Sequence, residues 1–246
     1  MRIDILTIFP EMFTNIISSS IIKRAIEKDA VRIIVHDFRA FSSNKHNKVD
    51  DTPYGGGAGM VLSLQPVLDC LFSIPNYLTA LKILTSAGGK VYNQETAHLF
   101  ADQDHIIIIC GHYEGIDARI LNYIDIEVSI GDFILTGGEI PAMVIIDSVI
   151  RLLPNVISNE SIIEESFNNN LLEYDQFTKP PVYNNLSVPD VLMSGNHEEI
   201  RKYRRYSSLK NTLVKRPDLL KNTVLTNEDQ KLLLKIKKEL SEKENL

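Results

Sequence analysis

Short, nearly continuous apolar segments alternate with helical patterns along the first 130 residues, and this alternation most constrains the fold. The predicted strands are 3–8, 31–35, 81–86, 105–110 and 124–130. Apolar side chains recur at helical spacing over 12–26 and again over 93–102, which begins with a candidate Asn cap. Apolar strands of this kind that alternate with helices predict a parallel sheet covered by helices on both faces.

The character of the chain changes after Pro154. The preceding segment, 141–154, predicts a helix that is apolar on more than one face, which is typical of a helix buried in the protein or against a second subunit. Ser and Asn clusters follow, and a Thr226–Asp229 capping box starts the last predicted helix. We predict an α/β domain at 1–158, an interdomain linker at 159–176 and a small, mostly helical domain at 177–246.

The two cysteines, Cys70 and Cys110, make no disulfide framework. Cys110 follows an apolar run and is predicted to be a small buried thiol in a reducing compartment. No apolar run reaches membrane-spanning length, and Pro10 and Glu11 come too early for a signal peptide. We therefore expect a soluble cytoplasmic protein that has no membrane partner.

The net charge of −6 argues against simple coating of nucleic acid, but the charge is unevenly spread. The segment 197–221 has eight Lys and Arg side chains and three Asp and Glu, a local net charge of +5. Such a segment is a candidate phosphate-contacting surface. The alternative is an ordinary solvated helix face.

Glycine clusters occur at 50–60, 85–89, 110–117 and 129–143, and the last three follow predicted strands. No Lys-Ser/Thr pair follows the first cluster, and the first strand leads into FPEMF without glycine, which excludes a phosphate loop and a dinucleotide fingerprint. Ligands of open α/β sheets bind at the carboxyl ends of strands. We therefore predict one shared pocket, with ordinary tight turns as the alternative.

The predicted pocket has little basic charge, since Lys90 and Arg119 are its nearest cations. A triphosphate would need more positive charge than these two side chains supply. A neutral adenosine with a cationic tail would suit backbone donors together with a carboxylate. The candidate carboxylates are Glu114, Asp132 and Glu139.

Five motifs in order, FPEMF, VDDTPYGGGAGM, CGHYEGID, SIGDFILTGGEIPAM and VLMSGNHEEIRKYRR, resemble the bacterial tRNA (guanine-N1)-methyltransferases, the TrmD family. The resemblance extends from Phe9 to Leu220. It implies a SPOUT-class α/β fold with a carboxyl-terminal trefoil knot, and an obligate homodimer. It also implies S-adenosylmethionine as cofactor and, as substrate, the tRNA guanosine at position 37, just 3′ of the anticodon. Family enzymes are helped by Mg²⁺, although no carboxylate cluster in this sequence indicates a metal site. DNA is not an expected partner.

The resemblance also implies site residues. The cofactor-binding residues would be Leu84, Thr85, Ser86, Ala87, Gly111, Tyr113, Glu114, Ile130, Gly131, Phe133, Leu135, Gly137, Gly138 and Pro141. The RNA-binding residues would be Asp50, Gly57, Gly59, Arg201, Arg204 and Arg205. The chain departs from the family at Ser86–Gly89, where a Ser-Pro-Gln-Gly type sequence is usual.

Methylation of guanine N1 requires loss of the N1 proton, which a carboxylate can accept, and negative charge then develops toward O6, where a cation can stabilise it. The resemblance implies Glu165, in place of the usual Asp, as the general base. It implies Arg151 as the cation. Two alternatives stay open, a different SPOUT methyltransferase that acts on ribosomal RNA and a non-catalytic RNA-binding relative.

Overall fold

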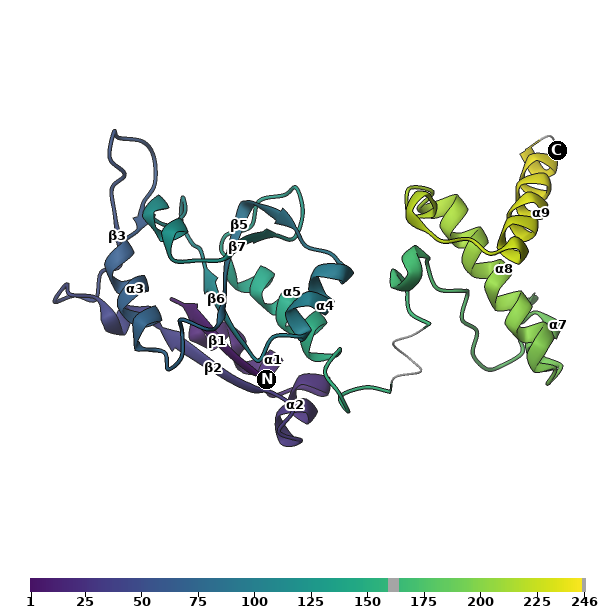
Figure 1. Ribbon diagram of the computed structural model, residues 1–246, viewed down its shortest axis with the longest axis horizontal. Coiled ribbons are helices and arrows are strands. Elements are labelled where there is room, and N and C mark those ends of the chain that lie inside the picture. The colour runs from purple at the N-terminus through teal and green to yellow at the C-terminus, as the bar shows by residue number, and fades with distance from the viewer. Residues whose placement is uncertain (159–163, 245–246) are drawn as a thin grey trace. The chain divides into compact units, whose positions relative to one another are not determined.

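A computed structural model describes residues 1–158 and 164–244, and the side chains of residues 1–158 and 164–242. The chain divides into two compact units, Met1–Ser158 and Asn159–Leu246. Figure 1 shows a sheet flanked by helices in the first unit and a group of helices in the second.

The first unit is built on a five-stranded parallel sheet with the strand order β2-β1-β6-β5-β7. Its strands are β1 (Arg2–Thr7), β2 (Arg32–Asp37), β5 (Leu81–Val91), β6 (His105–Cys110) and β7 (Ile126–Ser129). The five predicted strands and their parallel arrangement are confirmed, because buried apolar runs leave few other ways to satisfy the backbone.

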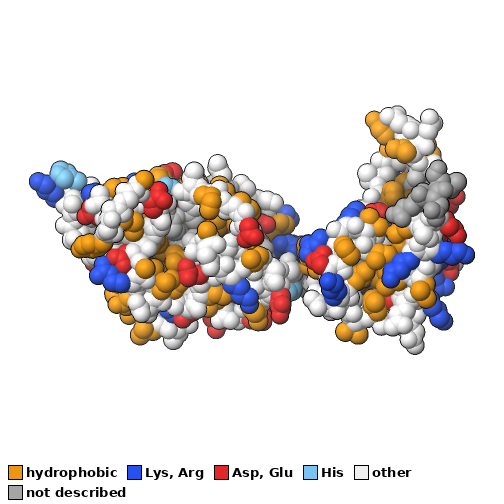
Figure 2. Space-filling model, turned by 90° about the horizontal axis from the view of Figure 1, so that it is seen from above, with side chains coloured by type: hydrophobic (Ala, Val, Ile, Leu, Met, Phe, Trp, Pro, Cys, Tyr) orange, Lys and Arg blue, Asp and Glu red, His pale blue; other side chains and the backbone are white. Residues whose placement is uncertain are grey.

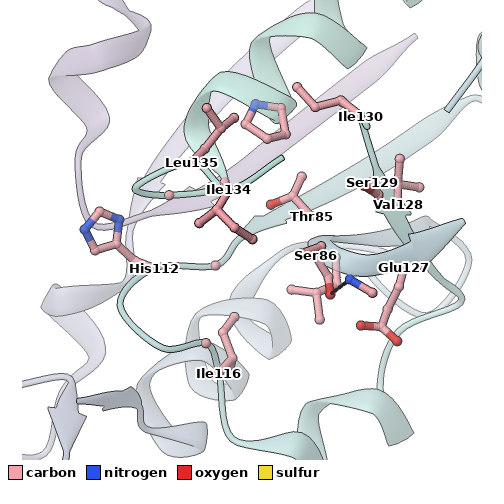
Figure 3. Close-up of a pocket in the computed structure, with 18 of the residues that line it drawn as sticks. Thr85, Ser86, His112, Ile116, Glu127, Val128, Ser129, Ile130, Ile134 and Leu135 are labelled. Atoms are coloured by element: carbon pink, nitrogen blue, oxygen red, sulfur yellow. Dashed lines mark hydrogen bonds between the residues drawn. The ribbon is translucent and has the colours of Figure 1, made fainter. Parts of the chain in front are cut away.

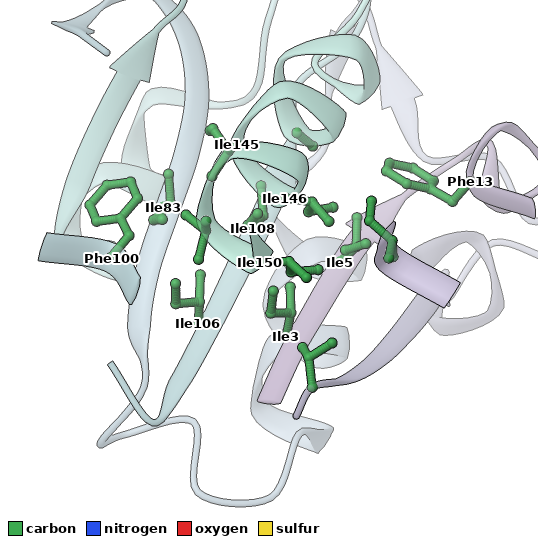
Figure 4. Packing of buried hydrophobic residues seen from close by; sticks show 14 of the residues in the cluster. Ile3, Ile5, Phe13, Ile83, Phe100, Ile106, Ile108, Ile145, Ile146 and Ile150 are labelled. Carbon is green, nitrogen blue, oxygen red and sulfur yellow. The ribbon is translucent and has the colours of Figure 1, made fainter. Parts of the chain in front are cut away.

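Helices cover one face of the sheet through its largest apolar cluster. They are α1 (Thr14–Ile17), α2 (Ser20–Glu27), α4 (Gln94–Ala101) and α5 (Glu139–Ile150). Figure 4 shows Ile145, Ile146 and Ile150 of α5 beside side chains of β1, β5 and β6. The Asn cap predicted for α4 is confirmed, since the Asn93 side chain accepts a hydrogen bond from the Thr96 N–H.

A second apolar cluster covers the other face. It involves α3 (Leu64–Ser73) and the short 3-10 helices η2 (Phe38–Phe41) and η3 (Ala118–Asn122). The predicted buried thiol is confirmed for Cys110, and burial raises its pKa well above the usual value. The strands β3 (Asp50–Asp51) and β4 (Val61–Leu62) form a short antiparallel pair, and the glycine-rich loop at 52–60 connects them.

Two local features differ from the sequence prediction. The helical pattern at 12–26 is broken into η1 (Pro10–Phe13), α1 and α2, with Ser20 at a positive φ of 51° where α2 begins. The strand predicted at 81–86 continues to Val91, but its register with β7 shifts between Thr85 and Lys90. The glycine segment therefore bulges within β5 instead of following it.

The second unit is mostly helical. Its elements are η4 (Asn168–Asn170), β8 (Val182–Tyr183), β9 (Leu186–Ser187), α7 (Asp190–Met193), α8 (His197–Lys215), η5 (Leu219–Asn222) and α9 (Asn227–Glu244). Leu171, Leu209, Leu233 and Ile236 form its buried core. The predicted capping box is confirmed, because the Thr226 and Asp229 side chains each accept the other residue's backbone N–H.

The linker predicted at 159–176 is corrected in part. Residues 159–163 lie outside the described residues. Residues 164–176 belong to the second unit and dock on α8, where the Leu172 N–H donates to Thr212 Oγ1 and the Ser208 hydroxyl donates to the Leu172 carbonyl. The Ser166 hydroxyl accepts the Glu173 N–H and the Asn170 amide donates to the Asn222 carbonyl, so polar side chains of this segment are used within the second unit.

Candidate functional site

A pocket of about 470 Å³ lies at the bulge of β5 and the carboxyl ends of β6 and β7, and we call it the sheet-end pocket. In Figure 3, His112 and Ile116 lie on one side of it, and Ser86, Glu127 and Ser129 lie on the opposite side. All fourteen residues predicted to bind cofactor line it: Leu84, Thr85, Ser86, Ala87, Gly111, Tyr113, Glu114, Ile130, Gly131, Phe133, Leu135, Gly137, Gly138 and Pro141. Residues of the three glycine clusters at 85–89, 110–117 and 129–143 therefore surround one cavity.

Glycine is needed where the loops around this pocket approach one another. The Gly138 N–H donates to the Gly111 carbonyl at 2.7 Å, and a Cβ on Gly138 would overlap Thr85 Oγ1 and lie 2.7 Å from the Gly111 nitrogen. A Cβ on Gly89 would lie 2.6 Å from the Glu127 carbonyl carbon. These close contacts join α5, β5, β6 and β7 at the pocket. A side chain at Gly138 would disturb folding as well as binding.

The carboxylates of the pocket differ from those predicted. Glu114 lines it, whereas Asp132 and Glu139 do not, and Glu127 of β7 lines it without having been predicted. Glu139 is buried and accepts a hydrogen bond from Thr7 Oγ1 at 2.8 Å. Glu127 interrupts a mostly apolar strand, and an acid in such a position faces a polar site or solvent, although the sequence does not show which.

The loop predicted to contact RNA lies against the sheet-end pocket. Asp50 belongs to β3, while Gly57 and Gly59 are exposed at φ values of 136° and 82°. The Glu114 N–H donates to the Met60 carbonyl, and Glu114 Cγ would lie 2.5 Å from a Cβ on Gly59. The glycine loop and the pocket loop are thus in direct contact.

His112 lines the pocket and packs against two aromatic rings. Its ring contacts those of Phe9 and Tyr113, with centroids 5.0 and 4.9 Å apart. Its Nδ1 lies 3.7 Å from Glu139 Oε2 and makes no hydrogen bond with the described residues. No group of three or more His, Cys, Asp or Glu among the described residues could hold a metal ion.

Glu165 lies in a second pocket, of about 450 Å³, within the second unit, and we call it the Glu165 pocket. Its lining residues are Glu164, Glu165, Asn168, Asn169, Leu171, Leu172, Tyr174, His197, Ile200, Arg201, Arg204, Arg205 and Ser208. The Tyr174 hydroxyl donates to Glu164 Oε2 at 2.7 Å. Burial and this carboxylate raise the pKa of Tyr174. Glu164 thus has a structural partner inside the pocket.

The other predicted catalytic residue, Arg151, belongs to the first unit. We expected it inside the helix at 141–154, but α5 ends at Ile150 and Arg151 is its C-cap, with its N–H donating to the Asp147 carbonyl. Arg151 and Glu165 therefore belong to different compact units.

The three arginines of α8 predicted to contact RNA have different surroundings. Arg201 makes two hydrogen bonds to Glu198 on the same helix. Arg205 makes two to Asp229, at 2.6 and 2.8 Å. Arg204 lies 4.7 Å from the centroid of the Tyr174 ring. In Figure 2, Lys and Arg side chains of the second unit alternate with acidic and hydrophobic ones on the side shown, so no continuous basic face is seen there.

In residues 1–158 and 164–244, no helix combines the length and the apolar character needed to cross a membrane.

Comparison with known proteins gives one consistent result. Residues 1–222 match the family model described as tRNA (Guanine-1)-methyltransferase TrmD. A protein of the Aster yellows witches'-broom phytoplasma is 54% identical, covering 98% of this chain and 99% of its own, and one of Clostridium novyi is 52% identical, covering 95% and 97%. One of Latilactobacillus sakei is 50% identical, covering 99% and 100%. All three are named tRNA (guanine-N(1)-)-methyltransferase.

Proposed function

The chain belongs to the tRNA (guanine-1)-methyltransferase family, and from this premise we propose that it methylates N1 of the guanosine at position 37 of tRNA. It is a transferase of the tRNA (guanine-N1)-methyltransferase type, as its relatives over nearly the full chain are named. The family implies the methyl donor S-adenosylmethionine.

The sheet-end pocket supports the assignment of the donor site. Its volume of about 470 Å³ lies within the range of about 300–1,000 Å³ that is usual for small-molecule sites. Glycine-rich loops let backbone groups approach an adenosine, and Glu114 and Glu127 offer negative charge to a cationic sulfonium and amino group. When bound, S-adenosylmethionine supplies an electrophilic methyl group. The residues of the pocket would hold it at the carboxyl edge of the sheet and exclude water.

We assign to Glu165 the deprotonation of the guanine that accepts the methyl group. In the proposed step the Glu165 carboxylate takes the proton from guanine N1, which leaves the N1 electron pair available for the methyl group that S-adenosylmethionine would supply. Arg151 stabilises the negative charge that develops toward O6. Glu165 is preferred over Glu164 because it holds the position directly before Ser166 and Phe167, where the family resemblance implies the general base.

The fold and assembly that the family implies are part of the proposal. The trefoil knot is proposed from the family alone, and Gly138 packs tightly against Thr85, Cys110 and Gly111 where the pocket loops meet. The exposed apolar side chains Ile140 and Val144 on α5, 44% and 42% exposed, support a homodimer that would cover them.

A methyl-transfer assay tests the function. Purified protein, S-adenosylmethionine and an unmodified tRNA transcript with guanosine at position 37 should yield 1-methylguanosine at that position, measured by mass spectrometry of nuclease fragments. A transcript with adenosine at position 37 should yield none. Transfer to ribosomal RNA alone would favour a different RNA methyltransferase, and binding of tRNA without transfer would favour a non-catalytic protein.

A further inference from the structure

Arg204 differs from the arginines beside it because no residue that the structure describes accepts a hydrogen bond from its guanidinium. Arg201 and Arg205 each form two hydrogen bonds with a carboxylate, whereas Arg204 donates none to any described residue. Its Nε is shielded from solvent, so a ligand would meet the Nη groups of this side chain, which is 42% exposed. Exposed guanidinium N–H groups that have no acceptor in the protein can donate to a ligand.

The Arg204 guanidinium is nevertheless held in place. It lies over the ring of Tyr174 with Cζ 4.7 Å from the centroid, and Nη1 is 3.7 Å from Glu164 Oε2. The Tyr174 hydroxyl donates to the same Glu164 oxygen. These three side chains support one another, so the guanidinium is oriented before any ligand binds, which lowers the entropy lost on binding.

The place of this group points to its ligand. Arg204 lines the Glu165 pocket, where the proposed general base lies, and also a neighbouring hollow of about 660 Å³ that includes Phe177 and Met193. A guanine whose N1–H faces a carboxylate presents O6 next to that edge and N7 beyond it. The guanidinium fork matches the O6 and N7 acceptors of guanine, the commonest specific contact of arginine with a base. We place the guanine in the Glu165 pocket and not in the neighbouring hollow, because the Glu165 pocket contains the carboxylate of the proposed general base.

We propose that Arg204 binds the O6–N7 edge of the target guanine and so selects guanine at the methylated position. This inference rests on the proposed function, in which Glu165 takes the N1 proton of the same base. An adenine in this orientation would place its N6 amino group against the guanidinium, donor against donor, and would be rejected. Arg204 is then a specificity residue and not one of the phosphate contacts expected from the charge of α8.

A double-mutant cycle between protein and RNA tests the contact. The wild type and Arg204→Lys are compared on tRNA with guanosine or 7-deazaguanosine at the target position, because 7-deazaguanosine lacks the N7 acceptor but keeps N1–H and O6. The single-turnover rate is measured at subsaturating tRNA. With the wild type, 7-deazaguanosine should lower the rate about tenfold. With Arg204→Lys the rate on guanosine should also fall about tenfold, and the analogue should cause less than a twofold further loss.

Arg201→Lys is the matched control, because it changes an arginine of the same helix that is paired with Glu198. It should keep the tenfold effect of the analogue. Equal rates of the wild type on guanosine and 7-deazaguanosine would overturn the inference, and this result does not depend on how any variant folds. An effect of 7-deazaguanosine in Arg204→Lys as large as in the wild type would also overturn it. Formation of 1-methylguanosine by the wild type tests the proposed function separately, so a failure of that function is distinguishable from a failure of this contact.

Discussion

The guanidinium of Arg205 makes two hydrogen bonds to the carboxylate of Asp229 and thereby joins α8 to α9. Asp229 is 2% exposed, and it also caps α9 through the Thr226 N–H. Although Arg205 belongs to a basic segment, its charge is used inside the second unit. We therefore expect Arg205 to contribute to stability more than to tRNA affinity.

Asp229→Asn should destabilise the second unit and change its dependence on pH. Because Arg205 is 32% exposed, the loss of its two hydrogen bonds to the carboxylate costs about 2 kcal/mol and not the larger cost of stranding a fully buried charge. The hydrogen bonds from Arg205 hold the pKa of Asp229 at about 2, below the usual 3.8. Because the folded-state pKa is lowered, the stabilisation is complete above about pH 4 and is lost as the pH falls toward 2.

Urea unfolding of the full chain, followed by helical circular dichroism, measures this difference at several pH values. The stability gap between the wild type and Asp229→Asn should close between about pH 4 and pH 2. Glu228→Gln, which removes an exposed neighbouring carboxylate, is the control and should show no such gap. A gap for Asp229→Asn that stays constant across this range would contradict the ion-pair argument.

Arg201 is the α8 arginine that we expect to contact phosphate, because its pair with Glu198 is solvent-exposed and such pairs contribute little to stability. Arg201→Gln should weaken tRNA binding and reduce the slope of log affinity against log salt by about 1. Filter binding at several salt concentrations measures the slope. An unchanged slope would leave this side chain as part of an ordinary solvated helix face.

The sheet-end pocket can be tested without disturbing the glycine contacts. Ala87 lines the pocket and is exposed, so Ala87→Trp adds a side chain to the cavity and leaves the core intact. We expect S-adenosylmethionine affinity to fall at least about tenfold, because the ring takes space that the ligand needs. Ala40→Trp, at another exposed alanine outside the pocket, is the control. Calorimetry that shows equal affinity for both variants would move the donor site elsewhere.

The exposed apolar face of α5 leads to a prediction about assembly. Val144→Glu places a charge on this face without touching the buried side of the helix. If two copies bury this face, the charge would be desolvated and the dimer should dissociate at micromolar concentration. Light scattering after size exclusion measures the mass. A variant that retains the dimer mass would exclude α5 from the interface.

The strands were predictable because a buried strand of a parallel sheet is apolar throughout, and His105–Cys110 matches its prediction residue for residue. The positions of the pocket loops followed from the same sheet, since parallel strands end at one edge. The break before Ser20 and the continuation of β5 past its glycines depend on backbone geometry that residue type specifies weakly.

Charge patterns predicted less than apolar patterns did. Three similar arginines on α8 have three different environments, which depend on Glu198, Tyr174 and Asp229. Asp229 lies on another helix and Tyr174 on the preceding loop, so their proximity is a property of the tertiary fold. Glu127 was not among the predicted pocket carboxylates, also because of the tertiary fold. Its exposure to the pocket depends on the packing of β7 against the bulge of β5.

Glu165→Gln gives the sharpest test of the mechanism. The amide keeps the size and polarity of the side chain but cannot accept the N1 proton. Removal of a positioned general base lowers the rate by about a hundredfold or more. Single-turnover methylation at saturating tRNA and S-adenosylmethionine measures this step, and both affinities should be retained because the proton transfer belongs to the transition state.

Glu164→Gln is the matched control, since it changes the adjacent carboxylate, which accepts the Tyr174 hydroxyl. An amide oxygen can still accept that hydroxyl, so the loss of rate should be about tenfold at most and should arise from weaker orientation of Arg204. If Glu164→Gln abolished the chemistry while Glu165→Gln retained it, the two carboxylates would exchange roles. Glu165→Asp should keep partial activity, because the shorter side chain retains the carboxylate but lies farther from the base it must deprotonate.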